Sequence, residues 1–167
     1  MSRGRSRAKR ERAATRGRTF SSSSGDTLDR EGASHDRAGA HRWYAAAIVA
    51  LASFITYVLT LQPGVVGGDG GELAAAACQG GIAHPPGYPL YTMLAWLAAR
   101  VPAGDDPLAR INFLSALFAA GAGAALVWAV ARWTCNVWAG VLAGSLFCFS
   151  PLVWRYAVGA EVFALNN

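Results

Sequence analysis

The chain has 167 residues, of which 53% are hydrophobic and 15% charged, and its formal net charge is +5. Its apolar residues lie in long uninterrupted runs, which argues against a small soluble domain and indicates a membrane protein. Eleven of the fifteen Lys and Arg precede Trp43, so the charge excess belongs to the N-terminal segment. Such a segment can bind phosphates, but no folded nucleic-acid-binding domain and no interleaved aromatic residues accompany it. We therefore expect no nucleic-acid partner.

Residues 1–42 are rich in Arg, Ser and Gly and nearly free of large apolar side chains. They bury too little surface to offset the entropy of ordering, so we expect a disordered, basic tail. The positive-inside rule places this tail in the cytosol. Glu11 is the one acid in the first 25 residues, which is also typical of a mitochondrial transit peptide, and that alternative stays open.

Three apolar runs are predicted to cross the membrane. Residues 43–62 carry no charge and, at about 1.5 Å rise per residue, match the thickness of a bilayer core. Residues 111–131 form the second run and residues 137–150 the third, in which Gly140 and Gly144 have the GxxxG spacing that favours close helix packing. The predicted fold class is therefore all-α, a polytopic membrane protein with about three transmembrane helices.

The segments between these runs are predicted to lie on the luminal side. In the loop of residues 63–110, residues 72–78 have the composition of a short helix and residues 89–100 read as an interfacial or re-entrant helix, too short to span. Residues 151–167 would return to the lumen or its surface. Tyr88, Tyr91, Trp96 and Trp154 are expected as membrane-interface aromatics in preference to a platform on which a sugar stacks.

Asp69 and Glu72 are the first candidates for chemistry, in a glycine-rich stretch that begins the luminal loop. Their i, i+3 spacing puts both carboxylates on one face of a helical turn, where Asp69 could act as a general base or bind a cation. The same spacing is that of a capping box, in which Asp69 caps the helix and Glu72 bonds back to its backbone. Both interpretations remain open from the spacing alone.

His84 precedes Pro85-Pro86-Gly87-Tyr88-Pro89, a stiff segment because three prolines fix φ. Held by this rigid segment, the His84 side chain could transfer a proton or bind an anionic head group. The alternative is a loop histidine that is hydrogen-bonded to a neighbouring carbonyl. Its spacing from Asp69 and Glu72 matches no recognised metal signature, and we predict no metal site.

Arg155 and Glu161 lie six residues apart in the last segment. Arg155 could pair with a phosphate and Glu161 with a sugar hydroxyl or a cation, and the alternatives are an interfacial anchor and a solvated acid. The three cysteines are scattered and read as small apolar fillers. A nucleotide phosphate loop is excluded because its lysine is missing, and an EF-hand loop because its alternating oxygen ligands are missing.

Four stretches occur in an order that resembles a known family: GGDGGEL, GIAHPPGYPLYTMLAWL, ARINFLSALF and SPLVWRYAVGAEVFALNN. They are similar to the amino-terminal part of the transmembrane protein O-mannosyltransferases, membrane glycosyltransferases of the GT-C type. The resemblance covers residues 43–167 and departs from the expected pattern at Gly70, where we expect Ser.

The resemblance implies an endoplasmic-reticulum enzyme that transfers mannose from a dolichyl-phosphate donor to Ser or Thr of secreted or receptor ectodomains. Asp69 would be the base for the acceptor hydroxyl and Glu72 a second catalytic residue. His84, Tyr88, Arg155 and Glu161 would contact substrate, with the HPPGYP segment shaping the cleft for the lipid phosphate. No cofactor is implied beyond this donor.

The family has further helices beyond those of this sequence, so we expect a fragment or a truncated isoform, and activity of the chain alone is not implied. The alternative function is a non-catalytic membrane protein that assembles with other helices through Gly140 and Gly144.

Overall fold

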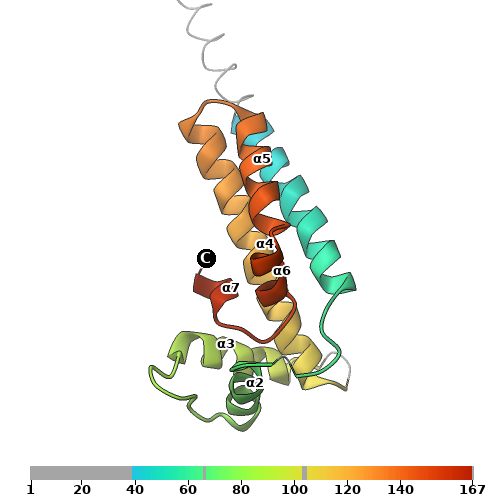
Figure 1. Ribbon diagram of the computed structural model, residues 1–167, viewed down its shortest axis with the longest axis vertical. Coiled ribbons are helices and arrows are strands. Elements are labelled where there is room, and N and C mark those ends of the chain that lie inside the picture. Colours follow the sequence, from blue (N-terminus) through green and yellow to red (C-terminus); the bar gives the residue numbers. More distant parts are fainter. Residues whose placement is uncertain (1–38, 66, 103–104, 167) are drawn as a thin grey trace, which may run out of the picture. The chain divides into compact units, whose positions relative to one another are not determined.

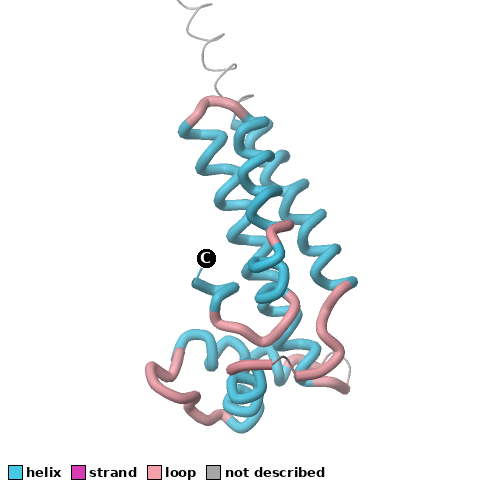
Figure 2. The backbone as a smooth tube through the Cα atoms, in the orientation of Figure 1, coloured by secondary structure: helices cyan, strands magenta, loops and turns pink. Residues whose placement is uncertain are grey.

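The computed structural model describes residues 39–65, 67–102 and 105–166. These residues are helical or in short connections, with no strand among them, which confirms the all-α class (Figure 2). The disordered tail predicted for residues 1–42 lies outside the described residues except for residues 39–42, which are helical. The tertiary contacts and cavities described below belong to the compact unit Arg42–Asn167.

Among the described residues a helix at Gly39–Leu59 comes first, and six further helices follow it in chain order (Figure 1). They are α2 (Gly70–Gln79), α3 (Pro89–Arg100), α4 (Pro107–Trp133), α5 (Val137–Cys148), α6 (Pro151–Ala157) and α7 (Phe163–Asn166). Among the described residues, two helices are long and apolar enough to cross a membrane, Gly39–Leu59 and α4, and a bent pair of α5 and α6 could make a third. The sequence predicted about three spans, and the structure gives three only if the bent pair is counted as one.

The first two spans are displaced from the predicted bounds. The first helix ends at Leu59 and not at residue 62, because the chain turns there and the Gln62 amide donates to the Val158 carbonyl at 3.0 Å. The second span begins at Pro107 and not at residue 111. Asp106 caps it by accepting from the Leu108 amide at 2.8 Å, and a proline suits the first helical position because its missing donor is not needed there.

The third span differs more, since the continuous helix predicted over residues 137–150 is a bent pair. The twelve residues of α5 rise only about 18 Å, less than a bilayer core. The chain then bends by 65° into α6. Ser150 and Pro151 make the break: the Ser150 hydroxyl accepts from the Val153 amide at 3.4 Å, and the proline opens α6.

α4 and α5 pack through glycines, as the GxxxG spacing predicts. A Cβ added at Gly140 would meet the Val127 carbonyl oxygen and the Ala131 side chain, and one added at Gly144 would meet the Val127 side chain. Only hydrogen at these positions allows the two backbones to approach so closely. The glycine face of α5 is therefore occupied by α4 of the same chain.

The segment between the first helix and α4 folds on a small core of its own. α3 has the bounds predicted for it, and the short helix predicted at residues 72–78 is α2. Leu73, Tyr91, Ala95 and Ile111 are buried there. Tyr91 is 2% exposed, so it is a core residue and not the interface aromatic that the sequence suggested.

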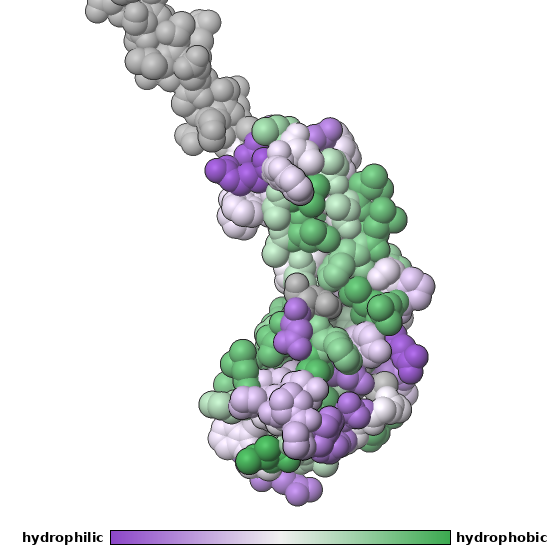
Figure 3. Space-filling model, turned by 60° about the vertical axis from the view of Figure 1, so that its left-hand side comes forward, coloured by the Kyte–Doolittle hydropathy of each residue, from purple (hydrophilic) through white to green (hydrophobic). Residues whose placement is uncertain are grey.

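The outer faces of the longer helices are apolar. Figure 3 shows hydrophobic residues gathered along the helices and hydrophilic ones toward the end that carries α2 and α3 and toward the opposite end. Ile48, Leu51 and Ile55 on the first helix and Leu142 and Leu146 on α5 are exposed. Such side chains suit lipid or further helices in a membrane.

Candidate functional site

Three of the predicted site residues meet at one cavity. Asp69, Arg155 and Glu161 line a space of about 410 Å³ beside α6 and the start of α2. The remaining lining residues are Gly67, Gly68, Tyr156 and Phe163. The cavity therefore joins the glycine-rich loop to the last segment of the chain, and it holds two carboxylates and one guanidinium.

The start of α2 positions Asp69. Its carbonyl accepts from the Leu73 amide at 2.9 Å, and Leu73 is fully buried, so the first turn is fixed to the core. Gly68 before it has φ of 90°, a conformation that L side chains rarely adopt. The Asp69 side chain makes no capping hydrogen bond and is 62% exposed. The carboxylate is thus held by its backbone and left open for a ligand.

Glu72 pairs with His84 instead of closing a capping box. One carboxylate oxygen, Oε1, accepts from the His84 amide at 2.6 Å, and Oε2 lies 3.0 Å from Nδ1 of the ring. The capping-box alternative is therefore wrong, as is a His84 bonded to a neighbouring carbonyl. The hydrogen bonds from His84, first the backbone one and then the ring, lower the pKa of Glu72.

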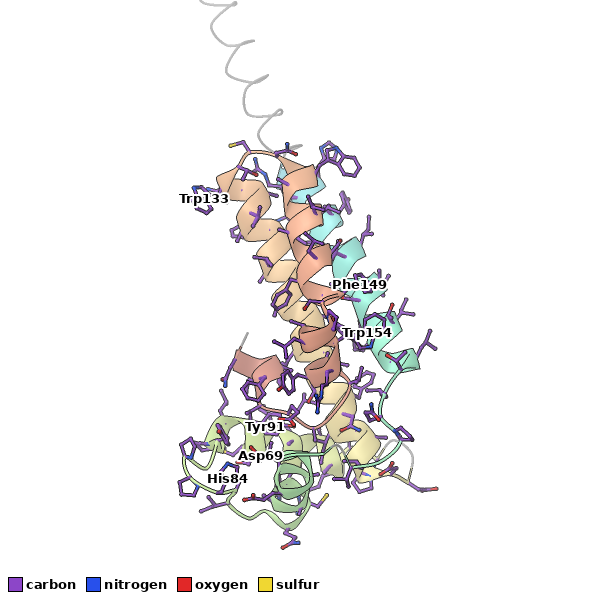
Figure 4. The ribbon with its side chains drawn as sticks, in the orientation of Figure 1. Asp69, His84, Tyr91, Trp133, Phe149 and Trp154 are labelled. Atoms are coloured by element: carbon purple, nitrogen blue, oxygen red, sulfur yellow. The ribbon has the colours of Figure 1, made fainter. Side chains whose placement is uncertain are left out.

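The same histidine reaches toward Asp69. Its other ring nitrogen, Nε2, lies 3.8 Å from Oδ2 of Asp69, which Figure 4 shows beside His84. His84 therefore stands between two carboxylates. The described residues contain no group of three or more His, Cys, Asp and Glu side chains arranged to hold a metal ion. The arrangement suits the movement of a proton, because one nitrogen of a neutral imidazole donates a hydrogen bond while the other can accept a proton.

Glu161 is buried, with 5% of its surface exposed, between Ala160 and Val162, which belong to the same core as Leu73. Burial raises its pKa, the negative charge of Asp69 raises it further, and Arg155 lowers it. Glu161 is therefore not the solvated acid that the sequence allowed. A carboxyl group that shares a cavity with another one keeps its proton to higher pH and can donate a hydrogen bond.

Tyr88 lies outside the cavity lining and touches the site through His84. The two rings meet edge to face, with centroids 6.0 Å apart. Tyr88 has φ of 42° directly before α3, and its carbonyl accepts from the Thr92 amide at 3.0 Å. The contact with substrate that the family resemblance implies for Tyr88 stays a prediction.

Sequence reasoning missed a buried polar cluster beside the site. The hydroxyls of Tyr91 and Ser115 and the side-chain carbonyl of Asn112 are buried, and none of the three atoms has a hydrogen-bond partner among the described residues. Burial raises the pKa of Tyr91 to about 12, the neighbouring Ser115 hydroxyl acts in the opposite direction, and the charge of Glu161 raises the pKa further. These residues belong to helices with little amphipathic pattern, so no sequence signal marked them.

Chemically, the cavity offers a base, a cation and a hydrogen-bonding acid. Asp69 is exposed enough to accept a proton from an incoming hydroxyl, Arg155 can bind an anion, and Glu161 can bond a polar substrate group. A cavity of this size with convergent polar groups is the usual form of a small-ligand site.

Comparison with known proteins gives a consistent result. Residues 69–167 match the family described as the N-terminal domain of protein O-mannosyl-transferase TMEM260. A relative from Mus musculus with this name is 43% identical over 136 residues, 81% of this chain and 19% of the relative. A relative from Dictyostelium discoideum is 42% identical over 115 residues, 68% of this chain and 14% of the relative.

The chain thus spans less than a fifth of the length of these relatives. No solved structure matches it at a significant level.

Proposed function

Because the chain belongs to the TMEM260 family of protein O-mannosyl-transferases, matching its N-terminal domain over residues 69–167, we propose that it forms the N-terminal part of such an enzyme. The reaction is transfer of mannose to a hydroxyl of Ser or Thr in secreted or receptor ectodomains. The observation that carries this proposal is the cavity in which Asp69, Arg155 and Glu161 meet.

Each residue has a defined part in the transfer. The acceptor hydroxyl attacks the anomeric carbon of mannose while Asp69 removes its proton, and the bond from that carbon to the phosphate oxygen breaks. Arg155 bears the charge that suits the departing phosphate. Glu161 donates a hydrogen bond to a sugar hydroxyl, which its raised pKa supports.

The donor is mannose linked to a polyprenyl phosphate, dolichyl phosphate. A second, apolar cavity of about 680 Å³ supports a lipid donor. Most of its lining is apolar, including Leu94 and Leu97 of α3, Phe113 and Leu117 of α4, and Leu61 after the first helix, and Asp105, Asp106 and Arg110 also line it. A prenyl chain, which carries no polar group to satisfy, fits walls of this kind.

The site faces the lumen of the endoplasmic reticulum, and the N-terminus is cytosolic. The eleven basic residues before Trp43 support this orientation, as does Arg132 at the α4–α5 connection. Trp43 contacts Trp128 with ring centroids 5.7 Å apart, so the start of the first helix and the end of α4 lie at one end. The α2 and α3 segment lies at the other end (Figure 1).

The alternative function, a non-catalytic protein that assembles with other helices through Gly140 and Gly144, is less well supported. Those glycines already contact α4, so they present no free face to another chain. A charged cavity also serves no purpose in a membrane scaffold, where intramembrane and interfacial charges usually mark a site.

The activity test uses the natural gene product that carries this sequence, at its full length. Transfer is measured from dolichyl-phosphate mannose to a Ser/Thr acceptor, with a nucleotide-linked mannose as the alternative donor. Asp69→Asn is expected to lower kcat by about 10²- to 10⁴-fold. Asp36→Asn, the same change in the basic N-terminal segment, is the matched control and should leave kcat unchanged. Full activity of the Asp69 variant would refute the assignment.

Orientation is tested with two native cysteines. Cys78 at the end of α2 and Cys135 in the α4–α5 connection are both exposed, whereas Cys148 is buried. In intact microsomes an impermeant maleimide should label Cys135, and Cys78 only after the membrane is opened. The reverse pattern would overturn the proposed topology, and labelling in mitochondria instead of microsomes would overturn the location.

A further inference from the structure

The segment of residues 69–88 holds a second element of the proposed site, and it rests on the function proposed above. Glu72, His84 and Asp69 form a line in which the histidine is bonded on one side and open on the other. We propose that His84, oriented by Glu72, takes up the proton that Asp69 removes from the acceptor hydroxyl. Glu72 is then a positioning residue, and His84 a proton acceptor that acts through Asp69.

His84 is held by more contacts than a loop residue requires. Its amide donates to Oε1 of Glu72 at 2.6 Å, its carbonyl accepts from the Gly87 amide at 2.7 Å, and its ring packs on Tyr88. Because backbone and ring are fixed separately, the direction of Nε2 is set before any substrate binds. Preorganisation of this kind is what a proton transfer needs.

The contact with Glu72 decides which ring nitrogen carries the proton. An ionised carboxylate only accepts hydrogen bonds, so Nδ1, 3.0 Å from Oε2, must donate. In the neutral ring Nε2 then has a free lone pair, and this nitrogen is the one that lies 3.8 Å from Oδ2 of Asp69. Nε2 of His84 and an ionised Oδ2 of Asp69 are both acceptors and cannot form a hydrogen bond, which accounts for the distance of 3.8 Å between them. One proton on Asp69 completes the pair.

The transfer balances without a further reactant. The acceptor oxygen bonds to the anomeric carbon as the bond from that carbon to the phosphate oxygen breaks, and the electron pair leaves on the phosphate. The acceptor proton passes to Oδ2 of Asp69 and then to Nε2 of His84. Glu72 stabilises the imidazolium through Nδ1, and His84 later releases the proton to water.

Neighbouring charges favour this direction. The titratable groups that face His84 are Glu72 and Asp69 beside α2 and Tyr88 before α3. Across the cavity, Arg155 and Glu161 face Asp69. The two carboxylates lie at the two nitrogens of the imidazole, so a proton leaving Asp69 is drawn to the histidine.

The test compares His84→Asn, Glu72→Gln and Asp69→Asn in the natural gene product at full length. Asn keeps an amide donor near the position of Nδ1 but has nothing at Nε2, so the bond to Glu72 is retained. His84→Asn should lower kcat by about ten- to a hundredfold with an unchanged KM for the donor. His41→Asn, an exposed histidine of the first helix, is the matched control and should have no effect.

The pH profile separates proton transfer from structure. In His84→Asn the acidic limb of kcat/KM should move to lower pH, because the imidazole no longer contributes to it. Glu72→Gln should move it the same way by a smaller amount, since a neutral partner stabilises the imidazolium less. If His84→Asn changes neither the acidic limb of the kcat/KM profile nor kcat, the inference is wrong. A raised donor KM with unchanged kcat would overturn it too, because His84 would then bind the phosphate.

Failure of this inference is distinguishable from failure of the proposed function. Full activity of Asp69→Asn refutes both, whereas an inactive Asp69→Asn beside a fully active His84→Asn refutes the inference alone. A measurement on the 167-residue chain in micelles needs no activity: the ring ¹⁵N shifts of neutral His84 should show the proton on Nδ1. A proton on Nε2 would contradict the inference.

Discussion

Two regions of this molecule are built on different physical principles. We call the Gly39–Leu59 helix, α4 and α5 the stem, and α2, α3 and residues 155–163 the polar end. The stem holds together by close backbone packing at glycines and presents apolar side chains outward. The polar end has a small core, and exposed and half-exposed groups such as Asp69, Glu72 and His84 lie around it.

This difference explains where chemistry can reside. In the stem a charge would meet lipid or a tightly packed neighbour, and both are costly. At the polar end, the Ala-rich α2 and the proline-bounded α3 form a platform, and the polar groups occupy its rim. A rigid base with open polar groups is the arrangement that binding and catalytic residues generally require.

The largest stability effect is expected in the stem. Gly140→Ala places a methyl group against the Val127 carbonyl and Ala131, and it should destabilise the protein by about 1–3 kcal/mol. Gly121→Ala is the matched control, because nothing lies within 4 Å of its added Cβ, and it should stabilise by up to about 1 kcal/mol. Thermal unfolding in detergent measures both. Equal melting temperatures would show that the stem does not depend on this contact.

A smaller effect is expected where the two regions join. Asp106→Ala removes the side chain that caps α4 and should cost about 1 kcal/mol. Asp105→Ala, next to it and without a capping bond, should change stability by less than about 0.5 kcal/mol. If both variants unfold alike, the cap does not fix the start of the span.

At the polar end, Glu161→Gln should stabilise the protein at neutral pH, by a smaller free energy than the Asp106 cap of α4 contributes. Since the folded-state pKa of Glu161 is raised by burial and by Asp69, the folded state binds more protons than the unfolded state above the ordinary glutamate value of 4.5. The free energy of unfolding therefore falls as pH rises from 4.5 through the raised folded-state pKa of Glu161. Gln cannot ionise, so the variant does not lose this stability. The difference in melting temperature should vanish on acidification to pH 4; a difference that persists there would contradict the assignment.

The smallest effect concerns Glu72, which is exposed to solvent. His84→Ala removes the ring hydrogen bond to Glu72 but keeps the backbone amide that donates to Oε1, so one of the two hydrogen bonds that lower the pKa of Glu72 is lost. A small loss of stability should therefore appear above pH 4.5. As pH falls through the lowered folded-state pKa, Glu72 takes up a proton in both proteins and the difference should fade. Unfolding curves between pH 7 and pH 3 test this, and a loss that grows on acidification would show the opposite sign.

The all-helical class, the first two apolar spans and the short helices between them could be predicted from the sequence, whereas the bend that divides the third span could not. Local rules suffice for these features. The bounds of α3 follow from Pro89 and from the residues around Pro102, and α2 follows from an alanine run ended by glycines. The GxxxG spacing on α5 also predicted its packing, because close approach needs glycines at that period.

Long-range contacts required the tertiary structure. Glu72 could cap its own helix or pair elsewhere, and only the fold brought His84, twelve residues on, to its carboxylate. Likewise, Arg155 and Glu161 reach Asp69 because α6 bends away from α5, and the burial of Glu161 follows from its neighbours in the core. The sequence tells which side chains can carry a proton or a charge. Their pKa values and their partners depend on the groups that the folded chain places next to them.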